Sequence, residues 1–178
     1  MGENITLRDD PYHPLHQGCP FDAEGVATRP VAIIERGVAR SPVYDRVTAA
    51  RDGVESTGHG LPVPNPFGPV AGNLVLEGGL GSVDDLIAGV KRGLLVTRVW
   101  YTNVVDPMTV TLTGMTRDGL FAIEDGKVTG AVRNFRFNQS VVQMLNEVEA
   151  LSGAELTGGV VCPALRVRSF HMTSVTEF

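Results

Sequence analysis

Two Asp-Gly pairs constrain the fold of this chain more than any other feature. Asp118-Gly119 and Asp125-Gly126 each lie between short runs that are rich in branched and aromatic residues. Such a pair between two strand-like runs is the strongest local signal for a β-hairpin, because both residues accept the backbone angles of a tight turn. We therefore predict an antiparallel meander over residues 94–137, with turns at both Asp-Gly pairs.

Glycine and proline punctuate the rest of the chain in the same way. The 178 residues include 21 glycines and 11 prolines, which is typical of short strands joined by turns. A further hairpin is expected around Arg36-Gly37, and a last strand within residues 163–173. Capping and glycine signals predict three helices, at residues 46–52, 83–92 and about 138–150.

These elements predict an α+β fold that is mostly β. We expect the antiparallel meander to form a barrel or a strongly curved sheet, with two or three short helices. The first thirty residues carry four prolines and little periodicity, so they are predicted to be an extended arm or an ordered loop. The expected organisation is a single domain over residues 1–178, with an arm at 1–30 and a β-rich core at 31–178.

The charge balance narrows the possible functions. Fifteen basic and twenty acidic residues give a net charge of −5, which argues against a nucleic-acid partner because the phosphate backbone requires a basic face. No apolar run approaches the roughly 20 residues of a membrane span, and the N-terminus lacks the pattern of a signal peptide. Two distant cysteines do not make a disulfide framework. A reduced, cytoplasmic location is expected, with no membrane contact.

The sequence HPLHQGC brings together metal-ligating residue types. His13, His16 and Cys19 have a spacing that is short enough for three side chains to bind one ion. A structural zinc site needs four ligands, however, so His59 or Asp22 would have to complete the set. The simpler interpretation is an exposed loop in which the two histidines are surface residues and the cysteine packs as a small apolar group.

A polar cluster is predicted within the meander. Its arginines lie in or next to strands, and threonine and asparagine side chains are close to them in sequence: Arg117, Arg133, Arg136, Thr116, Asn134 and Asn138. Arg133 and Arg136 differ by an odd number, so on a regular strand their side chains face opposite sides. Spacing alone favours turn residues and a solvated sheet face over a binding site.

An ordered set of motifs resembles the C-terminal region of the TldD/PmbA family. The set consists of GLLVTR, a tyrosine-containing strand, VDP, TGMTRDG, IEDG and VRNFRFN, in this order. The earlier stretch from the DDP sequence to STGHG is also similar to the family, so the resemblance covers nearly the whole chain. Members of this family were long labelled modulators of DNA gyrase and are now regarded as metallopeptidases.

The resemblance also shows which family elements this sequence does not contain. Family members are more than twice as long, and their H-E-x-x-x-H motif lies upstream of the matched region. The catalytic type of subunit takes a third zinc ligand from a Cys-Gly-Lys loop, which the stretch SGAELTGGVVCPALRV lacks, so no ligand role is carried onto Cys162. The C-terminal end of the sequence resembles the PmbA-like (TldE-like) subunit, which is the partner that does not hold the zinc. This resemblance implies no zinc and no catalytic residue in this chain.

The resemblance implies a part in a dimeric peptidase that cleaves or matures small or unfolded peptides. This chain would supply a wall of the chamber, as a homodimer or as a heterodimer with a family partner that holds the zinc. The expected substrate-binding residues face the cleft: Arg117, Thr116, Arg133, Asn134 and Asn138. The alternative is a non-catalytic scaffold domain that mediates protein interaction, in which the same motifs only build the fold.

Overall fold

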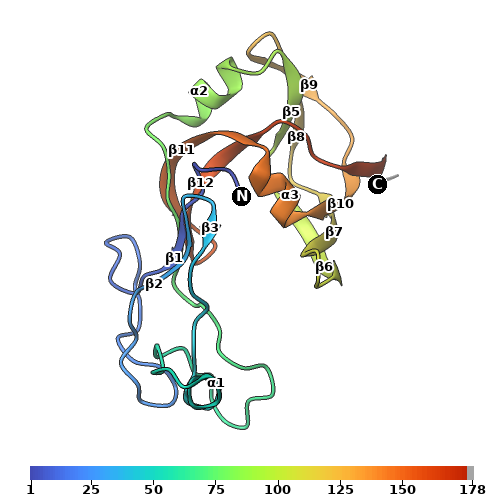
Figure 1. The fold of residues 1–178 in the computed structure, drawn as a ribbon. Helices are drawn as coiled ribbons and strands as arrows, with labels where there is room; N and C mark the ends of the chain where they lie inside the picture. Colours follow the sequence, from blue (N-terminus) through green and yellow to red (C-terminus); the bar gives the residue numbers. More distant parts are fainter. Residues whose placement is uncertain (176–178) are drawn as a thin grey trace. The chain divides into compact units, whose positions relative to one another are not determined.

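The computed structural model describes residues 1–175 and shows a mostly β protein whose strands form three sheets (Figure 1). Two compact units share the chain. The N-terminal unit contains Glu3–Gly78 together with Ala154–Pro163, and the C-terminal unit contains Met1–Gly2, Gly79–Gly153 and the residues from Ala164 onward. Whether residues 1–178 behave as one domain stays a prediction. Among the described residues, no helix is long and apolar enough to cross a membrane.

A six-stranded sheet has the order β11-β12-β4-β1-β2-β3; β1 to β4 belong to the N-terminal unit, whereas β11 and β12 belong to it only over Ala154–Pro163. The strands of this sheet are β1 (Leu7–Asp9), β2 (Val31–Glu35), β3 (Val38–Ala39), β4 (Leu74–Leu76), β11 (Val148–Thr157) and β12 (Val160–Val167). Residues 1–30 were expected to be an arm, yet their strand β1 pairs with both β2 and β4. This strand has only three residues and is followed by Pro11, Pro14, Pro20 and Pro30, so it left no periodic pattern in the sequence.

Local signals account for the turn and the helix of this unit. Arg36 and Gly37 have φ of 48° and 79°, so the expected β2–β3 hairpin turns at these two residues. Helix α1 (Arg46–Asp52) begins where the Asp45 carboxylate accepts a hydrogen bond from the Thr48 backbone N–H, and it ends at Gly53 in the left-handed conformation. Both elements confirm the sequence prediction.

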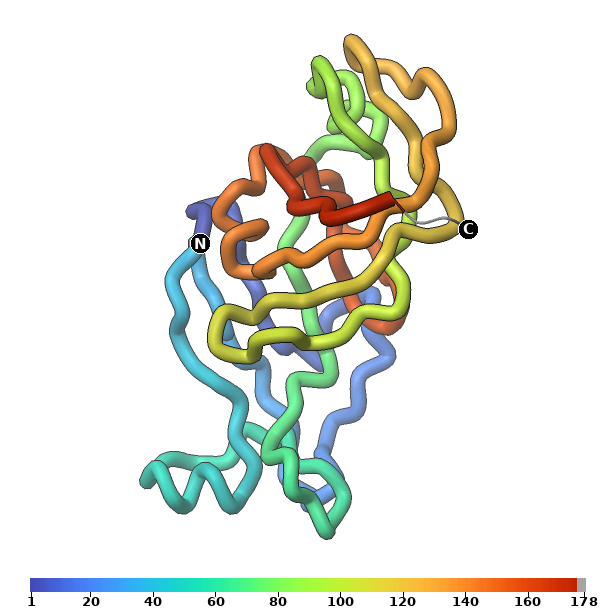
Figure 2. The backbone as a smooth tube through the Cα atoms, turned by 90° about the vertical axis from the view of Figure 1, so that its right-hand side faces the viewer, coloured from blue at the N-terminus to red at the C-terminus, as the bar shows by residue number. Residues whose placement is uncertain are grey.

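The C-terminal unit contains the predicted antiparallel strands. A three-stranded sheet has the order β5-β8-β9 and a four-stranded sheet has the order β13-β10-β7-β6. The strands are β5 (Arg92–Val96), β6 (Val99–Asp106), β7 (Thr111–Thr116), β8 (Leu120–Glu124), β9 (Lys127–Ala131), β10 (Phe135–Ser140) and β13 (Met172–Val175). Figure 2 shows the β6–β7 hairpin with β10 running beside β7.

Asp125-Gly126 forms the predicted hairpin turn between the paired strands β8 and β9, whereas Asp118-Gly119 joins β7 to β8, which lie in different sheets and do not form a hairpin; the strands do not close into a barrel. Asp118 and Asp125 both have positive φ, and the two pairs join β7 to β8 and β8 to β9. The chain passes from the three-stranded to the four-stranded sheet at Thr97 and Arg98, and again through residues 132–134. Both sheets therefore stay open, and the prediction of curved antiparallel sheets is correct while the barrel is not.

Two helices flank these sheets, and both end earlier than predicted. Helix α2 (Val83–Ala88) starts with a capping box between Ser82 and Asp85, as expected, but it ends at Gly89. Helix α3 (Val141–Asn146) is capped by Ser140. It stops four residues before the predicted end because β11 already begins at Val148, whose side chain is buried. The apolar spacing was correctly identified, but strand pairing decided the conformation.

Candidate functional site

Strand register creates one polar face on the four-stranded sheet. Trp100 of β6 pairs with Met115 of β7, which pairs in turn with Arg136 of β10. Paired residues of neighbouring antiparallel strands lie on the same face, and so do residues two positions apart on one strand. The Arg117 backbone N–H donates to the Arg98 carbonyl oxygen at 3.0 Å, which extends the pairing by one more step.

We name this surface the β6–β7 face. It consists of Arg98, Trp100, Met115, Arg117, Arg136 and Asn138. The opposite face of the same sheet contributes Phe137, Thr116 and Gln139 to the interior, where their exposed fractions are 3%, 1% and 8%. The alternation of buried and exposed residues along β10 therefore sets which side chains are available to a ligand.

Two arginines share one tryptophan ring and one carboxylate on this face. The Cζ atoms of Arg98 and Arg117 lie 4.5 and 5.7 Å from the centroid of the Trp100 ring. Nη1 of Arg98 is 2.7 Å from Oδ2 of Asp118, and Nε of Arg117 is 3.6 Å from Oδ1 of the same carboxylate. We call these four residues the arginine–tryptophan cluster.

The cluster lies on the surface, so the contacts between its own side chains are weak. The side chains of Arg98, Arg117 and Asp118 are 50–55% exposed. An exposed ion pair contributes about 0–1 kcal/mol, and a cation–π contact at such a site about 0.5–1 kcal/mol. A ligand that offers a carboxylate or an apolar surface can therefore compete with the internal contacts.

Thr116 and Asn134, both predicted to bind substrate, occupy supporting positions. Thr116 is 1% exposed; its hydroxyl donates to Oδ1 of Asn134 at 3.0 Å and accepts from the Phe135 backbone N–H at 3.0 Å. These bonds fasten the segment before β10 to the end of β7. A direct contact of either side chain with peptide stays a prediction.

Arg133 and Asn138 are exposed but differ in position. Arg133 lies in the link between β9 and β10, outside the regular strands. Asn138 pairs with Thr113 of β7 and belongs to the β6–β7 face with Arg117. The sequence prediction missed Arg98 and Trp100, although Arg98 ends the GLLVTR motif two residues before Trp100, a spacing that puts both on one side of a strand.

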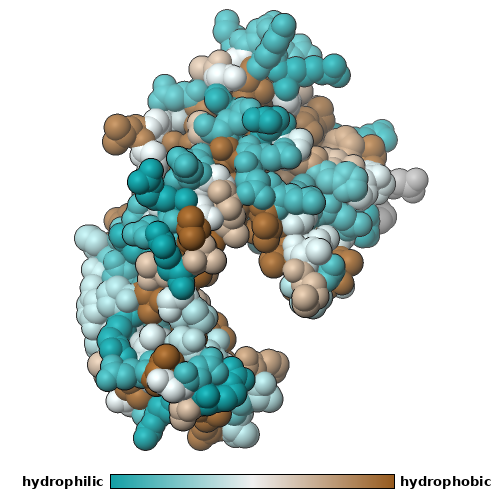
Figure 3. Space-filling model, in the orientation of Figure 1, coloured by the Kyte–Doolittle hydropathy of each residue, from teal (hydrophilic) through white to brown (hydrophobic). Residues whose placement is uncertain are grey.

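Strand β6 forms one edge of its sheet and exposes apolar side chains. Val99, Tyr101, Val104 and Val105 are 46%, 73%, 63% and 57% exposed. Part of this apolar surface is visible around β6 in Figure 3. The register with β7 shifts between Trp100 and Asn103, where Tyr101 has a φ of 54°. An edge strand leaves one row of backbone groups unpaired, so it can pair with an added strand.

The metal-ligating residue types do not assemble into a site. Within residues 1–175, no group of three or more His, Cys, Asp or Glu side chains is arranged to hold a metal ion. Nε2 of His16 lies 3.1 Å from the Leu74 carbonyl oxygen, and Nδ1 of His13 accepts from the Leu15 N–H. Asp22, a possible fourth ligand, instead accepts backbone N–H bonds from Glu24, Val26 and Gly60.

His59 belongs to a buried polar cluster of the N-terminal unit. Its Nε2 lies 3.0 Å from Oδ1 of Asp9, and its Nδ1 lies 2.9 Å from the Thr57 hydroxyl. Asn73 donates to the Asp9 carboxylate through both its backbone and its side-chain nitrogen. Burial raises the pKa of Asp9, but the bonds from His59 and Asn73 outweigh it, and the pKa is lowered.

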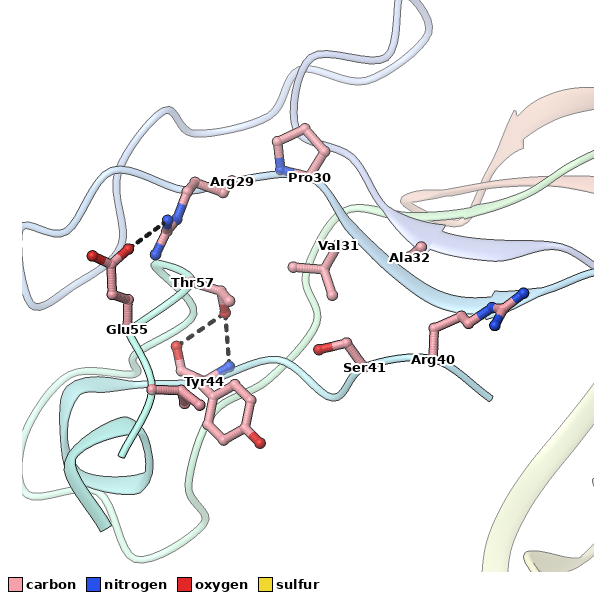
Figure 4. Close-up of a pocket in the computed structure, with 10 residues that line it drawn as sticks. Arg29, Pro30, Val31, Ala32, Arg40, Ser41, Tyr44, Glu55 and Thr57 are labelled. Atoms are coloured by element: carbon pink, nitrogen blue, oxygen red, sulfur yellow. Dashed lines mark hydrogen bonds and ion pairs between the residues drawn. The ribbon is translucent and has the colours of Figure 1, made fainter. Parts of the chain in front are cut away.

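An open pocket of about 680 Å³ lies in the same unit, where the chain after β3 separates from β2 (Figure 4). Thr57 fills part of the gap, because its N–H donates to the Tyr44 carbonyl oxygen and its carbonyl accepts from the Arg29 N–H. Both arginines at the rim have acidic partners: Arg29 pairs with Glu55 at 2.9 Å and Arg40 with Glu35 at 3.0 Å. The pocket thus concentrates less charge than the arginine–tryptophan cluster.

Comparison with known proteins connects this fold to a family. The model of the PmbA/TldA metallopeptidase C-terminal domain matches residues 1–174. A metalloprotease TldD homolog of Haemophilus influenzae is 27% identical over 177 residues, which cover 91% of this chain and 35% of that protein. This chain therefore spans well under half the length of such relatives.

Solved structures show the same relationship. TldE from Thermococcus kodakarensis has a TM-score of 0.84 and 30% identity, over 96% of this chain and 40% of that one. A Thermotoga maritima protein named as a modulator of a DNA gyrase has a TM-score of 0.82 at 23% identity, over 97% of this chain and 40% of that one; it supports the fold alone. The chain belongs to the PmbA/TldD family, and its described residues form that family's C-terminal domain.

Proposed function

We propose that this chain is a TldE-like, non-catalytic part of a peptidase assembly and that it binds extended peptide along β6. One observation carries the proposal: an exposed edge strand lies directly beside the arginine–tryptophan cluster. Family membership and the likeness to TldE support a role in an assembly with a family partner. The assembly would act on small or unfolded peptides, since only a chain without stable structure can pair with an edge strand.

The metallopeptidase name of the family implies zinc, but the described part of the chain does not provide a donor set for it. No three ligating side chains converge in residues 1–175. Where zinc is bound, in a partner of the catalytic type, it would polarise the scissile carbonyl and lower the pKa of a water molecule. We assign no chemical step to this chain, whose own residues bind and orient the peptide.

Peptide binding at β6 follows from main-chain chemistry. The outer row of β6 backbone groups can form hydrogen bonds to any extended chain, which gives affinity without sequence preference. Apolar side chains of the peptide would rest against Val99 and Val104, while the long side chain of Arg117 supplies donors on the adjoining face. Orienting an extended substrate in this way lowers the entropic cost of the reaction in the partner.

The direct test is reconstitution with a zinc-bearing TldD-type subunit of the same family. Cleavage of an unfolded peptide is measured for that subunit alone and with the 178-residue chain added. We expect co-elution of the two chains and faster cleavage, weakened by Arg117→Ala and unaffected by the matched control Arg168→Ala, an arginine that is 74% exposed in the same unit. Equal cleavage with and without this chain would contradict the proposal.

A further inference from the structure

We propose that the arginine–tryptophan cluster selects peptides that carry an acidic side chain, and that Asp118 occupies this subsite when no peptide is bound. The inference rests on the proposed function, because it requires a peptide strand next to β6. It adds a substrate preference that main-chain pairing alone does not provide. The chemistry recognised is a single Asp or Glu carboxylate on the side of the peptide that faces Arg98 and Trp100.

The geometry of strand addition places a peptide side chain at this point. A residue of the added strand that pairs with Arg98 or Trp100 points to the same face as its partner. Directly opposite residues have Cβ atoms about 4.5–5.5 Å apart, so a Glu side chain there reaches the guanidinium of Arg98. Arg117, at the end of the next strand inward, has its Cζ atom 5.7 Å from the centroid of the Trp100 ring and completes the pair of donors.

The position of Asp118 shows that the two guanidinium groups can bind one carboxylate together. Its Oδ2 is 2.7 Å from Nη1 of Arg98 and its Oδ1 is 3.6 Å from Nε of Arg117. Each guanidinium has five N–H donors in a planar fork, and these two contacts leave most of them for another acceptor. The longer contact to Arg117 and the half-exposed position of Asp118 make its carboxylate replaceable.

Charge on this face opposes that of the chain as a whole. The net charge is −5, which would repel an acidic peptide at long range. The end of the β6–β7 face next to the Asp118 turn, by contrast, holds Arg98, Arg117 and the exposed Arg136 with the carboxylate of Asp118, while the other carboxylate of this face, Asp106, lies at the opposite end of β6. The positive charge is local, so it selects an acidic residue at one position of a peptide rather than a uniformly acidic chain.

Trp100 makes the proposal measurable, because it is the only tryptophan of the sequence and its ring is close to both arginines. The probes are two extended octapeptides of valine, threonine and serine, N-acetylated and C-amidated, with glutamate or glutamine at one central position. They are titrated against the 178-residue chain, with Trp100 emission and calorimetry as readouts. We expect the glutamate peptide to bind about fivefold more tightly at low salt, the effect of one exposed charge pair.

Variants separate recognition from a structural role. Arg98→Ala and Arg117→Ala should each remove the preference for glutamate, while Arg168→Ala keeps it. Asp118→Asn should increase affinity for the glutamate peptide only, because it removes the internal competitor; asparagine tolerates the φ of 62° at this position. If an alanine variant does not fold, Arg98→Lys tests the loss of the fork at constant charge.

The outcomes distinguish this inference from the proposed function. Equal binding of both peptides would overturn the acidic preference and leave β6 as a general peptide edge. Binding of neither would overturn both. A glutamine peptide with a free C-terminal carboxylate serves as a third probe; if it bound as tightly as the glutamate peptide, recognition of the side chain would be wrong. Unchanged affinity in Asp118→Asn would exclude Asp118 as an internal competitor.

Discussion

Nε2 of His59 lies 3.0 Å from Oδ1 of Asp9, and the exposed fractions of the two side chains are 2% and 0%. The pair joins β1 to the loop that follows α1, two parts of the N-terminal unit that are far apart in sequence. Changing one partner of a buried hydrogen-bonded pair is costly when the other polar group stays buried without a partner.

Asp9→Asn replaces one accepting oxygen with an amide donor, so at least one donor from His59 or Asn73 loses its acceptor; we expect the N-terminal unit to be destabilised by about 1–3 kcal/mol, as measured by urea denaturation. The lowered pKa of Asp9 also fixes the sign of a pH dependence. Its contribution is present above the ordinary value of 3.8 and is lost as pH falls through the lower folded-state pKa. Asp9→Asn should show a smaller loss of stability over that acidic range; an unchanged pH profile would contradict a role for this carboxylate.

A substitution at Thr116 tests whether its hydroxyl stabilises the fold or contacts the substrate. Thr116→Val keeps the shape of the side chain but leaves the Phe135 N–H without its acceptor. We expect a loss of about 1–3 kcal/mol in unfolding free energy. The comparison is Asn138→Ala on the exposed side of β10, which should stay within about 0.5 kcal/mol of the original chain. Equal stability of Thr116→Val and the original chain would show that the hydroxyl is not structural.

The second Asp-Gly turn predicts a contrast between two glycines. Gly126 has a φ of 77°, and a Cβ there would lie 2.8 Å from the Ala88 carbonyl oxygen. Gly130 on β9 has open space around its Cβ position. Gly126→Ala should lower the melting temperature by several degrees, corresponding to about 1–2 kcal/mol. Gly130→Ala should leave it nearly unchanged or raise it. A similar effect of both changes would contradict the turn geometry.

Features that depend on a few neighbouring residues could be predicted from the sequence. The Asp-Gly turns, the Ser82 cap and the Gly53 stop each depend on backbone conformation within four residues, and the structure has all three. Features set by distant pairing were missed. Strand β1 is recognisable only through β2 and β4, and residues after Val148 follow β12 instead of continuing a helix.

In the candidate site, too, local motifs could be read from the sequence, whereas contacts set by strand pairing could not. Arg117 and Asn138 could be named from motifs, but their shared face depends on the register between β7 and β10. The register between β6 and β7 brings Arg98 and Trp100 to Arg117, although about twenty residues separate the two arginines in sequence. The burial of Thr116 could not be read from the motif, because one step along β7 turns its hydroxyl from the polar face into the interior.

The central claim is that peptide pairs with the outer edge of β6, and hydrogen exchange measures this most directly. Amide exchange of the 178-residue chain is followed with and without the glutamate peptide. We predict slower exchange over Val99–Asp106, with no change at β5, β9 and β13, the other edge strands of the two sheets in this unit. Protection at β5, β9 or β13 instead, or none at β6 under saturating peptide, would contradict the account.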